Sequence, residues 1–82
     1  MEEIRQIVKN YLLMEFLPGE DPEALNGTTP LITGGILDSL ATLKLVAFLE
    51  ERFGVTIEAH EADVDHLDTI DAIAALVKEK RG

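Results

Sequence analysis

The sequence predicts an all-α fold, a bundle of three main helices and one short helix with a long ordered loop between the first two main helices. Three observations support this class. The chain has only 82 residues, which is enough for one small domain covering residues 1–82. Apolar residues make up 46 % of it and recur with helical spacing in three segments. Glycine and proline separate these segments.

The first helix is expected over residues 2–17. Its apolar side chains recur at three- and four-residue steps, which places them on one face of a helix. These side chains are Ile4, Ile7, Val8, Tyr11, Leu12 and Phe16. Pro18 and Gly19 follow, and such a pair ends a helix.

Residues 18–37 are expected to form a loop. They have no sustained period, and they contain all three prolines and four of the six glycines. A loop of about 20 residues is longer than the usual connection in a compact domain, so we expect it to be held to the core. The apolar residues available for this contact are Leu25, Leu31, Ile32, Ile36 and Leu37.

The second main helix is expected from Ser39 to Phe53. Asp38 is a good N-cap, no glycine or proline interrupts the segment, and Gly54 follows at the C-cap. Residues 55–57 are β-like but too short for a sheet, and residues 60–66 are expected to form a short helical turn.

A last helix, capped by Asp68 or Thr69, is expected to run to about Lys80. The spacing of its apolar residues predicts that four of them face the core. They are Ile70, Ile73, Ala74 and Val77. Basic residues gather at its C-terminal end, where the helix dipole favours cations. They are Lys78, Lys80 and Arg81.

The second main helix has two apolar stripes on a helical wheel. The stripe expected to face the core contains Thr42, Leu45, Val46, Leu49 and Phe53. The opposite stripe contains Leu40, Leu43 and Ala47, flanked by Lys44, Glu50 and Glu51. One stripe is enough to pack a helix on its own domain, so the second predicts a surface for another protein. The alternative is a central helix buried on both sides.

The composition excludes several classes of function. The absence of cysteine excludes disulfides, thiolate metal sites and a cysteine nucleophile. Sixteen acidic and seven basic side chains give a net charge of −9, which disfavours nucleic-acid and membrane binding and favours basic protein partners. The acidity alternatively serves only solubility. No apolar run approaches the ~20 residues of a membrane span, and no signal peptide is seen, so a cytoplasmic location is expected.

Two other kinds of site are considered and set aside. Histidine and acidic residues are dense between residues 60 and 68, but the EF-hand order and the HExxH motif are absent, so no metal site is expected. Ser39 lacks the Gly-x-Ser-x-Gly elbow of a hydrolase nucleophile, and a chain of this length hardly supplies the pocket. We therefore expect no catalytic residues.

The loop meets the second main helix in the sequence Gly34-Gly35-Ile36-Leu37-Asp38-Ser39-Leu40. This junction puts a serine hydroxyl at the start of a helix. A phosphate esterified there would meet free backbone N–H groups and the positive end of the helix dipole. The simpler alternative is that Asp38 or Ser39 only caps the helix and that the glycines only turn the chain.

Several segments together resemble the acyl carrier protein family, which includes aminoacyl and peptidyl carrier proteins. The resemblance rests on the motif Asp38-Ser39-Leu40, on Leu45-Val46, on the run from Leu49 to Val55 with Ile57, and on the run from Leu67 to Ile73. It covers nearly the whole chain and implies a four-helix, acyl-carrier-like bundle.

The resemblance also implies a function. Ser39 would be esterified by 4′-phosphopantetheine, which a separate phosphopantetheinyl transferase supplies from coenzyme A. Its thiol would hold an acyl or aminoacyl group as a thioester, and a loading ligase and downstream transferase or synthase enzymes would perform the chemistry. Asp38 would help present Ser39 and would be recognised by the transferase. Partner enzymes would contact Leu40, Leu43, Ala47, Glu50 and Glu51. We expect a non-enzymatic monomer.

Two departures favour a carrier of a specialised pathway, of the acyl, aminoacyl, polyketide or nonribosomal peptide type. Ala41 and Lys44 stand where carriers of primary fatty-acid synthesis commonly have acids, and the segment from Glu58 to Leu67 looks longer than in that group. A fatty-acid carrier remains one alternative. A small acidic helical adaptor without a prosthetic group is the alternative from another class.

Overall fold

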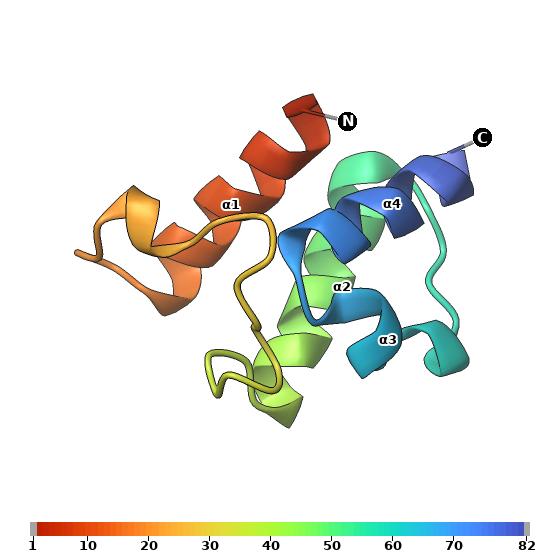
Figure 1. Ribbon diagram of the computed structural model, residues 1–82. Helices are drawn as coiled ribbons and strands as arrows, with labels where there is room; N and C mark the ends of the chain where they lie inside the picture. Colours follow the sequence, from red (N-terminus) through yellow and green to blue (C-terminus); the bar gives the residue numbers. More distant parts are fainter. Residues whose placement is uncertain (1, 82) are drawn as a thin grey trace.

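The computed structural model describes residues 2–81, and these residues form helices and loops without a strand (Figure 1). The elements are α1 (Glu2–Phe16), the 3₁₀ turn η1 (Pro22–Ala24), α2 (Ser39–Phe53), the 3₁₀ turn η2 (Ala59–Glu61), α3 (Val64–Leu67) and α4 (Ile70–Arg81). The predicted all-α class, with three main helices and one short one, is confirmed.

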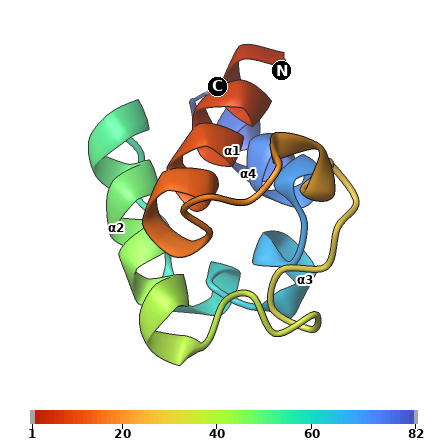
Figure 2. The same cartoon turned by 90° about the vertical axis from the view of Figure 1, so that its left-hand side faces the viewer.

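Helix α4 packs against α1, α2 and α3. Figure 1 shows it beside α1 and across α2, with α3 directly before it in the chain. In Figure 2, which is turned by 90°, α1 lies in front of α4. All four residues predicted to point inward are buried, and so is Leu76. This additional residue widens the apolar face of α4, which lets the helix contact several neighbours at once.

Helix α1 buries the predicted face through Ile4, Val8 and Leu12. It ends at Phe16 rather than Leu17, a difference within the normal fraying of a helix end. Tyr11 stacks on Phe48 of α2 with ring centroids 3.9 Å apart and planes only 9° apart. This aromatic pair ties the two long helices together.

The core face of α2 is rotated from the prediction. Ala41, Leu45 and Leu49 are buried, whereas the predicted core residues Thr42, Val46 and Phe53 are only partly buried. The prediction weighed hydrophobicity alone. The contact between Phe48 and α1 turns the helix toward its Ala41 side, where a small side chain allows close packing.

The loop between α1 and α2 is held to the core as expected. Leu25, Leu31 and Leu37 are buried, and Ile32 and Ile36 are half-buried against the same core. The loop also contains the short turn η1, which the sequence did not predict because it has no helical period.

Polar contacts fasten this loop to the segment that begins α4. The carboxylate of Asp68 accepts hydrogen bonds from the N–H groups of Ile32 (2.8 Å) and Thr33 (2.9 Å) and from the Thr33 hydroxyl (2.9 Å). These bonds lower the pKa of Asp68, and the backbone N–H of Thr33 contributes most. Asp68 therefore holds the loop rather than capping α4.

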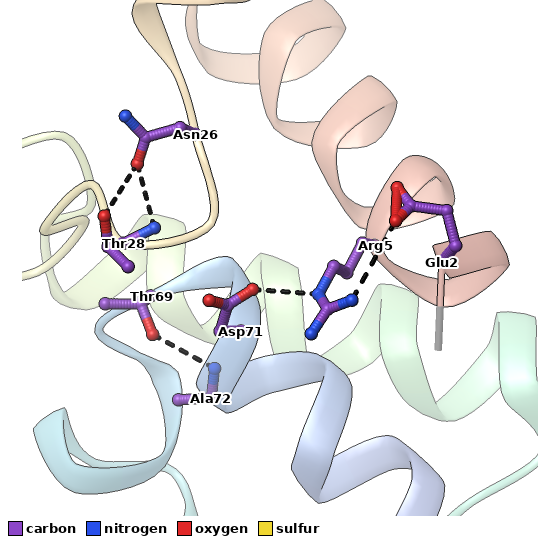
Figure 3. Close-up of polar contacts among 7 residues, drawn as sticks. All are labelled: Glu2, Arg5, Asn26, Thr28, Thr69, Asp71 and Ala72. Carbon is purple, nitrogen blue, oxygen red and sulfur yellow. Dashed lines mark hydrogen bonds and ion pairs between the residues drawn. The ribbon is translucent and has the colours of Figure 1, made fainter.

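The start of α4 is fixed by neighbouring groups (Figure 3). Thr69 caps the helix, since its hydroxyl accepts a hydrogen bond from the Ala72 N–H at 3.0 Å. Asp71 accepts a hydrogen bond from Arg5 of α1 at 2.8 Å, and its N–H donates to the Gly27 carbonyl at 3.0 Å. A side chain at Gly27 would collide with the Asp71 carboxylate, so glycine permits this close approach.

The predicted helical turn over residues 60–66 is divided into η2 and α3. Asp63 separates them because its carboxylate accepts a hydrogen bond from the His66 N–H at 3.1 Å and caps α3. Helix α3 has only four residues, and its Leu67 is fully buried against the core.

Candidate functional site

Asp38 sets the first residue of α2. Its backbone is extended, and its carboxylate accepts a hydrogen bond from the Ala41 N–H at 2.7 Å. Its carbonyl oxygen also accepts bonds from the N–H (2.9 Å) and the hydroxyl (2.8 Å) of Thr42. Such a cap stabilises a helix by about 1 kcal/mol. Ser39 is therefore held in the first turn of a rigid element.

Ser39 is exposed, and its hydroxyl makes no hydrogen bond to any group in residues 2–81. Asp38, and not Ser39, supplies the cap, so the hydroxyl is not needed to hold the helix. A free hydroxyl at a helix N-terminus fits a phosphate ester, because the N–H groups and the helix dipole there favour an anion.

The loop before Ser39 is tightly closed. The N–H groups of Ile36 (2.9 Å) and Leu37 (2.8 Å) both donate to the Leu31 carbonyl. Gly35 has a φ angle of +83°, which favours glycine, and a side chain at Gly34 would collide with the Pro30 carbonyl oxygen. The two glycines therefore serve the turn itself.

An apolar groove of about 680 Å³ opens beside Ser39. It lies between the start of α2 and the segment that contains α3. It is lined by Ile32, Leu37, Asp38, Ser39, Thr42, Leu43, Ala62, Asp63 and Val64. A flexible arm on Ser39 would have this apolar surface within immediate reach.

The outward stripe of α2 is exposed as predicted. Leu40 is 63 % and Leu43 64 % exposed, and Ala47 is exposed as well. Across the groove, Val64 of α3 is 44 % exposed. The sequence prediction did not include Val64; its signal is that it is an apolar residue between two aspartates.

The two acids predicted to contact partner enzymes, Glu50 and Glu51, differ in burial and in hydrogen bonding. Glu51 is exposed. Glu50 is half-buried, and its carboxylate accepts a hydrogen bond from the Ile57 N–H at 2.9 Å. Glu50 thus connects α2 to the segment that follows it, and Glu51 is the acid of this pair that faces solvent.

Two acids on the α3 side of the groove, Asp63 and Glu61, are paired with basic side chains. The Asp63 carboxylate lies 2.7 Å from Nδ1 of His66, and this contact lowers the pKa of Asp63 and raises that of His66. Glu61 pairs with Lys80, which lowers the pKa of Glu61. Within residues 2–81 no group of three or more histidine and acidic side chains is arranged to hold a metal ion.

Comparisons with known proteins agree with this geometry. Residues 2–77 match the family described as the phosphopantetheine attachment site. A probable acyl carrier protein, PigG, of Serratia sp. is 35 % identical over 84 % of this chain and 78 % of its own length. The D-alanyl carrier proteins of Lacticaseibacillus casei (33 % identical; 90 % of this chain, 94 % of theirs) and Lactococcus lactis IL1403 (32 %; 84 % and 87 %) are also similar.

A solved structure agrees as well. A chain in a crystal structure described as that of a FAD-dependent dehydrogenase superimposes with a TM-score of 0.76 at 33 % identity, over 85 % of this chain and 97 % of the other. The protein belongs to the phosphopantetheine-attachment family of carrier proteins.

Members of this family carry 4′-phosphopantetheine covalently and interact with phosphopantetheinyl transferases and biosynthetic enzymes. The free Ser39 hydroxyl and the neighbouring apolar groove are compatible with that group. None of the helices in the described part of the chain is long and apolar enough to cross a membrane.

Proposed function

We propose that this protein is a specialised carrier whose phosphopantetheine arm is attached to Ser39 Oγ. The observation that carries the proposal is the exposed, unbonded hydroxyl at the first residue of α2, next to an apolar groove. When bound, the arm supplies a thiol that holds an acyl or aminoacyl group as a thioester. The protein itself catalyses nothing, and it acts in the cytoplasm as a monomer.

The attachment step requires Ser39 to act as an acceptor. Its Oγ attacks the phosphorus next to the pantetheine unit of coenzyme A, and the O–P bond to the rest of the diphosphate breaks. The transferase takes the hydroxyl proton and releases adenosine 3′,5′-bisphosphate. Asp38 contributes by fixing the helix start, because its carboxylate is already bonded to Ala41.

Partner enzymes must contact α2, since Ser39 is its first residue. We assign the contact to Leu40, Leu43 and Ala47, which are exposed, together with Glu51. Val64 extends this apolar surface across the groove. Glu50 is assigned a supporting role, because its carboxylate is bonded within the chain.

An aminoacyl or another small acyl cargo is favoured. The names of the similar D-alanyl carriers support an aminoacyl group. The groove lining includes two carboxylates, on Asp38 and Asp63, and no basic side chain, so it tolerates an ammonium group. Because the similar solved chain belongs to a structure described as a FAD-dependent dehydrogenase, a flavin dehydrogenase is one candidate for a downstream enzyme.

The experiment that tests the proposal combines attachment and loading. The protein is incubated with coenzyme A and a broad-specificity phosphopantetheinyl transferase, and its intact mass is measured. We expect a gain of one phosphopantetheine on the wild type and none on Ser39→Ala, the matched control. The holo form is then offered D-alanine, ATP and a D-alanine-activating ligase, and a hydroxylamine-labile mass gain would support the aminoacyl cargo. No mass gain on the wild type in the first step would favour the adaptor without a prosthetic group.

A further inference from the structure

The exposed side of α2 differs from the rest of this acidic protein in its charge. The chain has a net charge of −9, but Lys44 is the only charged residue from Ser39 to Leu49. Lys44 is exposed, and it forms no ion pair with any residue in the range 2–81. The first three turns of α2 therefore present an apolar surface with a single positive charge.

The position of Lys44 places this charge within the proposed contact surface. Lys44 follows Leu40 by one helical turn, so the two side chains are neighbours on the helix. Both line a notch of about 190 Å³ between the end of α1 and the start of α2, together with Phe16, Asp38 and Ala41. The Tyr11 hydroxyl donates to the Lys44 carbonyl at 3.3 Å, which helps fix this turn.

None of the acids in residues 2–81 forms an ion pair with Lys44. The Asp38 carboxylate is bonded to the Ala41 N–H, and the Glu50 carboxylate is bonded to the Ile57 N–H. Glu51 lies about two turns beyond Lys44, and exposed Arg52 follows it directly, so a positive charge stands beside this acid.

We propose that Lys44 is a specificity-determining residue, and that the partner of this surface is an enzyme with an apolar pocket and a carboxylate beside it. The inference rests on the proposed function, because that function brings enzymes to Ser39. The leucines enter the pocket, and the carboxylate meets Lys44. An enzyme with a basic binding surface acts on this carrier less efficiently, because two like charges would face each other across the interface.

The test uses holo-protein in four forms, namely the wild type, Lys44→Ala, Lys44→Glu and the control Lys78→Glu. Lys78 is also exposed but lies on α4, so its replacement changes the net charge equally and leaves α2 intact. The probe is a malonyl transferase of bacterial fatty-acid synthesis chosen for a lysine- and arginine-lined carrier surface. The measured quantity is kcat/KM for malonyl transfer at low and high salt.

We expect Lys44→Glu to raise kcat/KM roughly fivefold or more at low salt, with Lys44→Ala between it and the wild type. Lys78→Glu should change it by about twofold at most, because distant charges are screened. A transferase in which a basic residue of that surface is replaced by glutamate should reverse the preference and favour the wild type. The altered transferase carries a carboxylate on its carrier-binding surface, as the proposed partner enzyme does.

Equal effects of Lys44→Glu and Lys78→Glu would overturn the inference, because only net charge would then matter. Unchanged kcat/KM in Lys44→Glu, or no reversal with the altered transferase, would overturn it as well. Failure of the proposed function is distinguishable, since in that case the intact mass would show no arm before any transfer is measured.

Discussion

Glu50 and Glu51 are adjacent in sequence, but their carboxylates have different surroundings. Glu50 is bonded to the N–H of buried Ile57, and Glu51 faces solvent. A buried N–H that loses its acceptor costs more than an ordinary hydrogen bond contributes. The same residue type therefore serves the fold at one position and remains free for a partner at the next.

Replacing the two acids by alanine should separate these roles. We expect Glu50→Ala to lower the free energy of unfolding by about 1–3 kcal/mol, because the Ile57 N–H loses its partner. Glu51→Ala, the matched control, should change it by about 0.5 kcal/mol at most. Urea unfolding followed by circular dichroism measures both values. Equal stabilities would show that the Glu50 bond does not hold the segment after α2.

Asp68 should control how firmly the loop before Ser39 is held. Its carboxylate accepts three hydrogen bonds from Ile32 and Thr33, so Asp68→Ala should speed amide hydrogen exchange at both residues. Asp65→Ala is the control, because Asp65 is an exposed acid in the same region. Exchange as slow as in the wild type would mean that the apolar contacts of the loop are enough to hold it.

At the scale of the elements, α2 has two apolar faces with separate purposes. Leu45 is fully buried in the core, whereas Leu43 is 64 % exposed. A contiguous apolar patch on a surface helix commonly marks an interaction site, and Leu40, Leu43 and Ala47 form such a patch. The exposed face begins at Ser39, so a protein that reaches Ser39 meets it first.

A substitution on the exposed face should impair the reaction with partner enzymes, whereas one on the buried face should lower the stability of the fold. Leu43→Glu should leave helix content unchanged and alter stability by about 0.5 kcal/mol at most, while lowering partner kcat/KM roughly tenfold. Leu45→Ala should lower the free energy of unfolding by about 2–5 kcal/mol, because it leaves a cavity in the core. Circular dichroism, urea unfolding and the rate of phosphopantetheine transfer distinguish them. Unfolding of Leu43→Glu would place that side chain in the core and contradict our assignment.

At the scale of the whole molecule, the acidic side chains that give the net charge of −9 do not all have the same role. Eight of the sixteen acids lie between Glu50 and Asp71. Five of these eight bind other groups of the chain and hold its elements together. They are Glu50, Glu61, Asp63, Asp68 and Asp71. The acidity of this region is therefore partly a structural property, and it says less about partners than the sequence suggested.

One of these acids links stability to pH. The contact with Asp63 raises the pKa of His66 above its ordinary value of 6.5. The contact therefore stabilises the folded protein fully below pH 6.5, and this contribution is lost as the pH rises through the pKa that His66 has in the folded protein. The lowered pKa of Asp63 means that its own contribution is lost only as pH falls below the ordinary value of 3.8.

The stability difference between wild type and His66→Ala should therefore shrink as pH rises from about 5 to about 8. Thermal unfolding at a series of pH values measures it. His60→Ala is the control, because His60 is the other histidine and is exposed. A difference that stays constant over this range would show that the charge of His66 does not contribute.

Local signals explain what the sequence could predict. The helices, the Asp38 cap and the exposed stripe on α2 depend on periodicity and on residues close in sequence. The rotation of α2 could not be predicted, because it depends on Phe48 meeting Tyr11 of another helix. The role of Asp68 depends on Ile32, 36 residues away, and residues that far apart leave no local pattern.

The central claim is that the arm is attached to Ser39, and peptide mapping tests it most directly. The protein is treated with coenzyme A and a phosphopantetheinyl transferase and digested, and the modified peptide is fragmented by tandem mass spectrometry. We predict one phosphopantetheine, located on Ser39 and absent from the Ser39→Ala variant. A phosphopantetheine on any other residue, or an unmodified wild type, would contradict this account.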